Sequence, residues 1–382
     1  MFEKLDPMPA DAILGLIAEH RADPRPDKVD LGVGVYRNAA GETPVLDVVK
    51  EAEQRLLATQ TTKAYLGTMG DPGFNAAMQD LVFRDSAAAE RLATLQTPGG
   101  SGSLRVAAGL ILKARPGARV WVSAPTWNNH VPLLGGAGLA LEPYAYYDTE
   151  RHSLEFERML ESLNAVPKAE IVLLHACCHN PSGIDPDEDQ WRAIADVVVE
   201  RELVPFFDMA YQGFAQDVEA DAFAIRHMAG LVPEMIVSSS CSKNFGLYRE
   251  RVGALSFLLA DRKARDTMLS QASAYVRTLY SMPPDHGAAV VRVVLEDAAL
   301  GKAWLEEVDG MRRRLAEMRE LLVDALADEA PEHDFSHLAR ATGMFCFLVD
   351  LAVAVLVASL KVELGDEAEI DRLLRLVDPV AG

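Results

Sequence analysis

Short, continuously apolar runs alternate with amphipathic segments along the middle of this chain, and this alternation limits the folds open to it. The runs occupy residues 118–125, 170–178, 203–210, 235–242 and 252–260. Between two of them, residues 187–201 have helical periodicity. Strands that are apolar along their whole length are buried on both faces, which is typical of a parallel sheet with helices on each side. The sequence therefore predicts an α/β fold built on a large, mostly parallel sheet.

The length of the chain predicts more than one domain. It has 382 residues, whereas a single domain commonly has about 150. A long charged helix is expected near residues 301–328, after the last apolar run. We expect a large ligand-binding domain over residues 45–309. An N-terminal arm and a smaller α+β domain are expected from residues 1–44 and 310–382.

The charge balance excludes two classes of partner. Lys and Arg number 37 against 57 Asp and Glu, which gives a net charge of −20. A surface this acidic repels nucleic acids and anionic membranes. The apolar segment 345–360 is too short to span a bilayer and contains Asp350, so we expect it to be buried core. With no signal-peptide pattern at the N-terminus, we expect a cytoplasmic protein.

The cysteine pattern favours buried thiols over a disulfide framework or a metal site. The four cysteines are Cys177, Cys178, Cys241 and Cys346, and no two have the C-x-x-C spacing. Such small side chains pack well in a core and stay reduced inside a cell.

Polar residues gather just after four of the predicted strands. They are Asn128 and His130, residues 179–183, residues 208–211 and residues 238–243. In an open α/β sheet, ligands bind outside the carboxyl ends of the strands. The sequence therefore predicts one site formed by these four strand ends.

A glycine-rich turn at residues 97–105 is suited to binding an anion. Glycines allow close approach of the backbone, and a helix N-terminus offers free N–H groups and a positive dipole. The alternative is a plain turn with Ser101 or Ser103 as the helix cap. The spacing does not fit a P-loop or a dinucleotide-binding fingerprint.

Lys243 follows four serine hydroxyls at the end of an apolar run. A lone lysine is usually solvated. At a buried strand end, desolvation and a cationic neighbour would lower its pKa and make it a Schiff-base nucleophile. Arg251, eight residues later, could bind a phosphate together with the serines.

Four further residues each have an ordinary structural interpretation. Asp208 is either a satisfied buried acid or the partner of a buried cation. Tyr211 and Trp127 are more often core aromatics than ligand contacts. The stretch from Asn180 to Gly183 could be a simple turn.

Taken together, eight stretches resemble the class I aspartate/aromatic aminotransferases, which are pyridoxal 5'-phosphate enzymes of fold type I with a seven-stranded sheet. The stretches are LGVGVYRNAAGETPVL (31–46), AYLGTMG (64–70), TPGGSGSLR (97–105), APTWNNH (124–130), HACCHNPSG (175–183), DMAYQGF (208–214), SCSKNFGLYRERVG (240–253) and VRTLYSMPPDHGA (276–288). They occur in the order of the family.

The resemblance implies a role for each central residue. Lys243 forms a Schiff base with the cofactor and moves the proton during catalysis. Asp208 pairs with the pyridine nitrogen, while Asn180 and Tyr211 bind the ring oxygen. Trp127 stacks on the ring and, with Asn180, borders the substrate.

The resemblance also implies a homodimer with shared active sites. The phosphate would be held by Gly100, Ser101, Ser240, Ser242 and Arg251, with Tyr65 from the second subunit. Arg277 of that subunit would face the side-chain carboxylate of a dicarboxylic substrate. Gly34 would lie near the substrate, and His130 and His175 would lie behind the cofactor contacts.

One departure concerns the substrate α-carboxylate. Lys361 stands where the family has an arginine, and Glu363 follows in place of a neutral residue. Lysine lacks the two-pronged geometry with which a guanidinium binds a carboxylate. Either Lys361 binds the substrate carboxylate with reduced affinity, or the shortened segment places it elsewhere and turnover is poor; we expect impaired but nonzero activity. A second departure is Met282, which replaces a small polar residue of the family.

These features predict an aminotransferase, EC 2.6.1.-. It would exchange an amino group between an aromatic amino acid, aspartate or glutamate and a 2-oxo acid such as 2-oxoglutarate, by a ping-pong sequence through the Lys243 Schiff base. One alternative is another reaction of the same cofactor, such as β-elimination or decarboxylation. The other is a cofactor-binding homologue whose catalysis is impaired by the replaced arginine.

Overall fold

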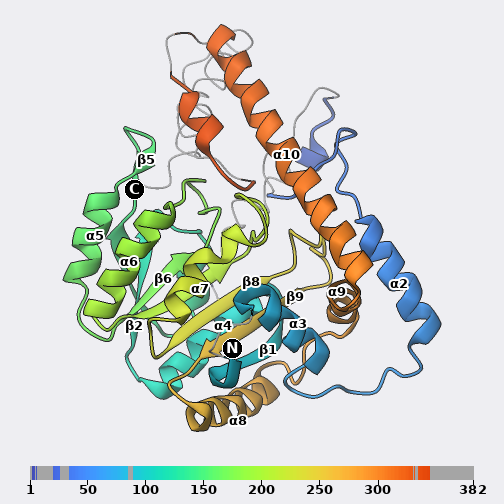
Figure 1. Ribbon diagram of the computed structural model, residues 1–382. Helices are drawn as coiled ribbons and strands as arrows, with labels where there is room; N and C mark the ends of the chain where they lie inside the picture. The colour runs from blue at the N-terminus through green and yellow to red at the C-terminus, as the bar shows by residue number, and fades with distance from the viewer. Residues whose placement is uncertain are drawn as a thin grey trace.

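The computed structural model describes residues 2–4, 6, 20–25, 34–84, 89–329, 331 and 334–344. Within them a seven-stranded sheet has the order β1-β9-β8-β7-β6-β2-β3 (Figure 1). Strands β3, β2, β6, β7 and β8 are parallel, and β9 pairs antiparallel with both β8 and β1. The predicted α/β fold with a mostly parallel sheet is confirmed.

The predicted apolar runs are strands of this sheet. The seven strands are β1 (Leu92–Pro98), β2 (Arg119–Ala124), β3 (Ala140–Ala145), β6 (Ile171–His175), β7 (Val204–Met209), β8 (Met235–Ser240) and β9 (Val252–Leu258). A separate pair is formed by β4 (Tyr147–Asp148) and β5 (Ser153–Leu154). Strand β6 ends three residues before the predicted run does, because the N–H groups of Cys178 and His179 donate to the Asp185 carboxylate.

The helices account for the amphipathic segments. They are α2 (Asp47–Thr59), α3 (Pro72–Phe83), α4 (Gly99–Ala114), α5 (Phe156–Ala165), α6 (Glu188–Glu200), α7 (Phe223–Ala229), α8 (Arg262–Leu279), α9 (His286–Glu296) and α10 (Ala298–Glu329). Short 3-10 helices cover Phe2–Lys4, Ala89–Arg91, Ala220–Ala222 and Ser336–Arg340, and a π-helical turn covers Val131–Gly135. Helix α6 begins at a capping box in which Asp187 accepts from Gln190, which fixes the predicted start.

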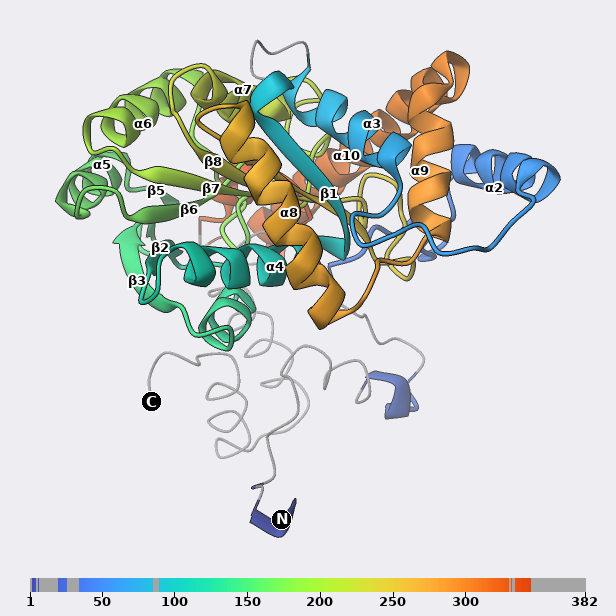
Figure 2. The ribbon, with the colours of Figure 1, turned by 90° about the horizontal axis from the view of Figure 1, so that it is seen from below.

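Alternate residues of the strands enter two different cores, one on each face of the sheet. Phe206 packs in the core shared with α4 and α8, whereas Phe207 packs in the core of α6 and α7, where its ring lies 6.0 Å from that of Trp191. Figure 2 shows α4 and α8 covering one face, with α5, α6 and α7 on the other. Burial on both faces explains why the strands are apolar throughout.

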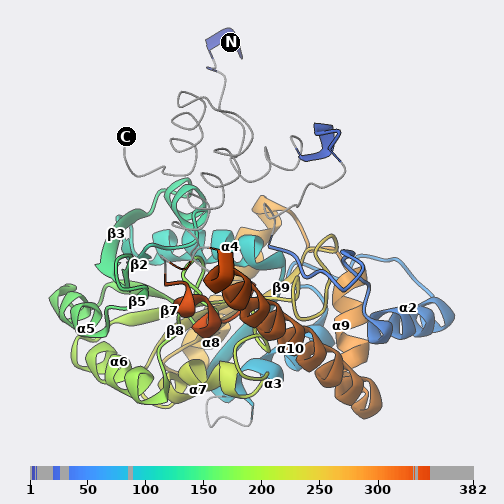
Figure 3. The same ribbon diagram turned by 90° about the horizontal axis from the view of Figure 1, so that it is seen from above.

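Helix α10 runs across the predicted domain boundary without a break, since it spans Ala298–Glu329. It lies in front of the sheet when the molecule is viewed from above (Figure 3). The division at residues 309 and 310 stays a prediction. Lys361, Cys346 and the apolar segment 345–360 lie outside the described residues. Among the helices that the structure describes, none is long and apolar enough to cross a membrane.

Candidate active site

Three of the predicted polar strand ends lie side by side because their strands are neighbours in the sheet. Asp208, near the end of β7, is in register with His175 at the end of β6 and with Ser238 on β8. Strand β2, which leads to Trp127 and His130, is the next neighbour of β6. The carboxyl ends of these parallel strands therefore meet at one edge of the sheet, as the sequence predicts.

A chain of hydrogen bonds runs behind Asp208. His130 Nε2 lies 3.0 Å from Asp208 Oδ2, and His130 Nδ1 lies 2.8 Å from Thr126 Oγ1. Thr126 Oγ1 is also 3.4 Å from His175 Nε2. The chain ends where the backbone N–H of Asn180 donates to His175 Nδ1 over 3.1 Å. It thus joins the β7 carboxylate to the turn after β6.

The last hydrogen bond of this series, from the Asn180 N–H, fixes the protonation of His175. A backbone N–H can only donate, so His175 Nδ1 must accept and carries no proton. A neutral His175 then donates from Nε2 to Thr126 Oγ1, which also lies within hydrogen-bond distance of His130 Nδ1. His130 is left to donate from Nε2 to Asp208. His175 is therefore neutral and held in one tautomer, and His130 joins Thr126 to Asp208.

Electrostatics support a neutral His175 and an ionised Asp208. Burial and the neighbouring His130 ring lower the pKa of His175 to about 3. Burial by itself would raise the pKa of Asp208, but the hydrogen bond from His130 and attraction to the nearby rings and Lys243 hold it below its ordinary value. Asp208 thus stays ionised near neutral pH, with Oδ2 bonded to His130.

Lys243 lies opposite this carboxylate, at the turn after β8. Its Nζ atom is 4.6 Å from the centre of the Tyr211 ring, within the range of a cation–π contact. Burial lowers the pKa of Lys243 to about 8, against attraction by Asp208 and with a further lowering by Arg251. A substantial share of its amine is therefore uncharged at mildly alkaline pH, as a nucleophile requires.

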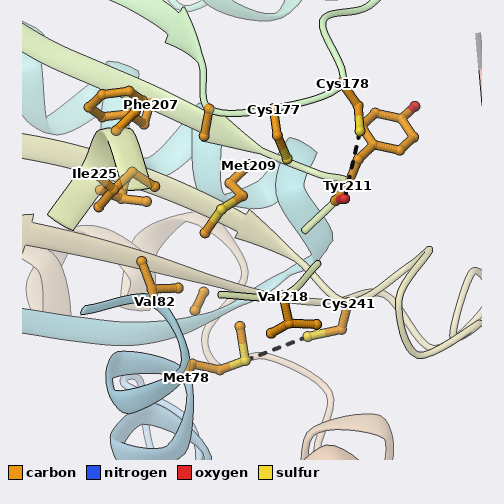
Figure 4. Packing of buried hydrophobic residues seen from close by; sticks show 14 of the residues in the cluster. Met78, Val82, Cys177, Cys178, Phe207, Met209, Tyr211, Val218, Ile225 and Cys241 are labelled. Atoms are coloured by element: carbon orange, nitrogen blue, oxygen red, sulfur yellow. Dashed lines mark hydrogen bonds between the residues drawn. The ribbon is translucent and has the colours of Figure 1, made fainter. Parts of the chain in front are cut away.

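Tyr211 is fixed by packing against the turn that follows β6. Its side chain is buried, and its backbone carbonyl lies 3.9 Å from Cys178 Sγ (Figure 4). Burial, with nearby Cys178 and Asp208, raises the pKa of the Tyr211 hydroxyl well above its ordinary value, although a hydrogen bond with the Asn180 side chain opposes this shift. The hydroxyl therefore keeps its proton at neutral pH and acts as a donor.

A cup of hydroxyls, backbone N–H groups and one guanidinium lies at the N-terminus of α4. Ser240 Oγ lies 3.1 Å from Ser242 Oγ, and Arg251 Nη1 donates to Ser242 Oγ over 3.4 Å. Gly99 has a φ of +71°, and a Cβ atom there would collide with Arg251 Nη2. Only glycine lets the guanidinium lie this close to the first turn of the helix.

The chemistry of this cup fits a phosphate dianion. Arg251 also donates to the carbonyl oxygen of Tyr248 over 3.1 Å, and neither of these partners carries a negative charge. The helix begins at Gly99, within the glycine-rich turn, so its free N–H groups open onto Ser240 and Arg251. A cation, hydroxyls and a helix N-terminus converge here, which is what phosphate binding requires.

Several predicted residues lie in the elements around Lys243. Asn180, Trp127 and Ser101 are half-buried, and the Trp127 ring meets His130 edge to face at 5.2 Å. Gly100 lies against Ser240, whose Cβ would be 3.3 Å from a Cβ at that glycine. Gly34 is half-buried in the extended segment that precedes α2.

Two predicted residues are not joined to the site within one chain. Tyr65 is 93% exposed and belongs to residues 61–67, all of which are exposed. Arg277 lies in the last turn of α8, is exposed, and donates to the Ser281 hydroxyl. Among the described residues, no hydrogen bond or ion pair connects either side chain to Lys243 or Asp208.

Sequence reasoning assigned no role to the hydroxyls that orient the histidines. Thr126 connects two rings that are 45 residues apart in sequence (175 − 130 = 45). Ser123 and Ser182 bond the two nitrogens of His179 at 2.9 and 2.8 Å. The only sequence signal for these three hydroxyls was their position, within four residues of the end of a predicted strand.

The expectation for the cysteines holds for the described residues. Cys177, Cys178 and Cys241 are buried free thiols, and burial raises the pKa of Cys178 to about 11, with further contributions from its neighbours. Within the described ranges, no cluster of His, Cys, Asp and Glu could hold a metal ion.

The fold and the site together define an enzyme that binds a phosphorylated cofactor beside a reactive lysine. The sequence matches the family described as aminotransferase class I and II over residues 26–363. The chain belongs to this family and is an aminotransferase that uses pyridoxal 5'-phosphate.

Relatives and solved structures agree with this assignment. The chain is 48% identical to an aspartate aminotransferase of Escherichia coli over 350 residues, which cover 91% of this chain and 88% of the relative. It is 47% identical to an aromatic-amino-acid aminotransferase of Pseudomonas aeruginosa over 349 residues, covering 91% and 87%. A structure of the Burkholderia pseudomallei aromatic-amino-acid aminotransferase, covalently bound to pyridoxal phosphate, superposes with a TM-score of 0.91 at 39% identity, covering 99% and 98%.

Proposed function

We propose that this enzyme exchanges an amino group between aspartate, glutamate or an aromatic amino acid and a 2-oxo acid such as 2-oxoglutarate. The observation that carries the proposal is the pairing of an ionised, histidine-bonded Asp208 with a half-buried Lys243 of lowered pKa. The names of relatives, which include both aspartate and aromatic-amino-acid aminotransferases, support this substrate range.

The residues that would hold the cofactor divide between its two ends. We assign the phosphate to Gly100, Ser101, Ser240, Ser242 and Arg251. We assign the ring to Asp208, Asn180, Tyr211 and Trp127. When bound, the cofactor supplies an electron sink for the pair of electrons left when the bond from the substrate Cα to hydrogen breaks.

Asp208 would act through its charge. The His130 hydrogen bond, with attraction to the nearby rings and Lys243, keeps Asp208 an anion in a poorly solvated place. An anion there favours a protonated nitrogen on whatever base it faces, since an opposite charge stabilises the charged form. Asp208 would thereby hold the proton on the pyridine nitrogen, and His130 fixes the carboxylate for this purpose.

Lys243 would bind the cofactor through Nζ and then move the proton. Its lowered pKa supplies the uncharged amine that attacks a carbonyl carbon. The same uncharged Nζ could also take the proton from the substrate Cα. One residue would thus serve as nucleophile and as general base, in a ping-pong sequence with two half-reactions.

A homodimer with shared active sites is part of the proposal. Tyr65 and Arg277 are exposed in one chain, and each carries a group suited to an anion. Tyr65 of a second copy would reach the phosphate, and its Arg277 would pair with the side-chain carboxylate of aspartate or glutamate. An aromatic substrate carries no such carboxylate, so Arg277 would turn aside for it.

The substrate α-carboxylate is assigned to Lys361, with Gly34 nearby. Lys361 lies outside the described residues, so this assignment rests on the sequence alone. The alternative of a homologue with impaired catalysis finds no support in the comparisons.

The test is a single half-reaction on the holoenzyme. Glutamate is added without any 2-oxo acid, and the absorbance band of the bound cofactor is followed. We expect the band to shift in the full stoichiometry of sites and to return when 2-oxoglutarate is added. Release of ammonia or carbon dioxide in place of this reversible change would assign the enzyme to elimination or decarboxylation. An unchanged band would contradict transamination of glutamate.

A further inference from the structure

The turn that carries Asn180 is held from outside the sheet by a carboxylate with no assigned role. Asp185 Oδ2 accepts from the Cys178 N–H over 2.7 Å, and Oδ1 accepts from the His179 N–H over 2.8 Å. Cys178 has a φ of +51°, a conformation that side chains other than glycine rarely adopt. The two bonds to Asp185 hold the backbone in this conformation immediately before Asn180.

Asp185 is itself bonded to the segment that returns after α10. Thr342 Oγ1 donates to Asp185 Oδ2 over 2.7 Å and lies 3.0 Å from the Gly183 carbonyl oxygen. The Thr342 N–H donates to that same carbonyl over 2.7 Å. Thr342 therefore bonds both ends of the three-residue stretch 183–185, which follows the Asn180 turn.

The next residue, Gly343, is hydrogen-bonded to the turn after β7 and to α10. The Gly343 N–H donates to the Phe214 carbonyl over 3.3 Å, and Arg319 of α10 donates to the Gly343 carbonyl over 2.7 Å. A Cβ atom on Gly343 would lie 2.6 Å from Cys178 Cβ. Residues 342–343 thus touch the turn that carries Asn180 and the turn that follows Tyr211.

We propose that Asp185 and Thr342 are positioning residues that fix the Asn180 turn and connect its geometry to α10. We call the pair the 185–342 clasp. It rests on the proposed function, in which Asn180 and Tyr211 bind the ring oxygen of the cofactor. A displacement of residues 342–343 would pass to Asn180 through Asp185 and to Tyr211 through Phe214.

Hydrogen bonds hold the clasp more than close packing does. A cavity of about 360 Å³ lies beside it, and its lining includes Asp185, Thr342 and Cys177. Side chains next to a void lose part of their packing contacts, so the turn depends on its polar partners. Removing one partner leaves the others unsatisfied, which is the costly case for a partly buried group.

The test uses the holoenzyme and four variants. Thr342→Val keeps the side-chain shape and removes the hydroxyl, and Thr342→Ser restores it. Asp185→Asn removes one acceptor, while Asp187→Asn is the matched control, because Asp187 is an exposed cap of α6 and asparagine also caps. Hydrogen exchange of the Cys178 and His179 amides, the pH titration of cofactor absorbance, and kcat are measured for each.

We expect Thr342→Val and Asp185→Asn to speed exchange of these two amides by about tenfold or more, as loss of a hydrogen bond to a charged group does. They should also shift the absorbance titration and lower kcat, while Thr342→Ser and Asp187→Asn stay near the wild type. Unchanged exchange in Thr342→Val, or equal effects of Asp185→Asn and Asp187→Asn, would overturn the clasp.

A fifth variant, Asn180→Ala, separates this inference from the proposed function. It removes the proposed contact to the ring and leaves the clasp in place. If its kcat and absorbance titration match the wild type, the role of Asn180 fails, yet the exchange data still decide whether the clasp exists. If Asp185→Asn does not fold, Thr342→Val carries the test alone.

Discussion

Asp208 and Arg277 are both charged residues of the proposed site, but they differ in exposure and in the contacts they make within one chain. Asp208 is 11% exposed and bonded to His130 inside the chain. Arg277 is exposed, and its side chain donates to the Ser281 hydroxyl, just beyond the end of its own helix. The buried floor of the site, Asp208 with its histidine chain and Lys243, is complete in one chain. The proposed rim, Tyr65 and Arg277, would need a second copy of the chain.

We infer from this difference that the floor and the rim serve different purposes in the proposed reaction. The floor needs fixed protonation states, and burial supplies them by excluding water and lowering the local dielectric. The rim needs to meet substrates of different shape, and exposed side chains on a helix end and a loop can move. Changes in the floor should therefore damage the reaction with every substrate, while changes in the rim should affect only some substrates.

The largest effect is expected for Lys243→Ala. It removes the nucleophile and the general base together, so turnover should fall by several orders of magnitude for both aspartate and phenylalanine. Steady-state kinetics measures the loss, and Lys302→Ala on the exposed face of α10 is the control. A structure with the cofactor bonded to a different lysine would contradict the assignment.

Asp208→Asn should come next. The amide can still accept from His130, but the charge opposite the ring nitrogen is gone, and loss of one such electrostatic contact slows turnover by about 100- to 1000-fold. Cofactor binding should remain, which absorbance and equilibrium dialysis can measure separately. A near-normal rate would remove Asp208 from the mechanism.

Arg277→Ala tests the rim. Aspartate and glutamate would leave a carboxylate unpaired, a loss of about 2 to 5 kcal/mol, whereas phenylalanine would lose little. The ratio of kcat/KM for aspartate over phenylalanine should therefore fall by at least about 30-fold. An equal loss for both substrates would mean that Arg277 is structural.

A mixed dimer shows whether the rim belongs to the other subunit. Lys243→Ala and Arg277→Ala chains are each poor with aspartate, but in a mixed dimer one site has an intact Lys243 and receives an intact Arg277. Activity with aspartate should reappear on mixing and unfolding–refolding the two variants together. If no activity returns although mixed dimers form, both residues act within one chain.

The sequence predicts the residues of the floor more fully than the contacts that orient them. Apolar runs ending in polar residues identify Asp208 and Lys243, because burial and the carboxyl edge of a sheet follow from local pattern. Thr126 and Asp185 act on residues distant in sequence, His175 and Thr342, so no spacing marks them. The sequence also does not show that α4 begins as early as Gly99, within the glycine-rich turn. Glycine has a low helix propensity, and tertiary contact with Arg251 overrides it.

A pH experiment sharpens the description of the floor. The pKa of Lys243 is lowered from an ordinary 10.5 to about 8, first by burial, so its amine loses its proton as the pH rises through about 8. The rate at which the cofactor-free protein captures pyridoxal phosphate should rise over that range and then level off. Arg251→Gln removes a positive charge and should move the midpoint upward. A midpoint near 10.5 in the wild type would mean that Lys243 is solvated.

The smallest effect is expected for Thr126→Val, which tests whether the histidine chain works as a unit. Valine keeps the shape of threonine but cannot accept from His175 Nε2 or donate to His130 Nδ1. His130 would then be free to adopt either tautomer, and only one of them donates to Asp208. A neutral hydrogen bond is worth about 0.5 to 1.5 kcal/mol, so kcat should fall by roughly 2- to 10-fold, equally for aspartate and phenylalanine. Nitrogen NMR of labelled histidines should show the proton of His130 shared between both ring nitrogens. If the proton stays on Nε2, burial and Asp208 alone fix the tautomer, and the chain behind His130 contributes only to packing.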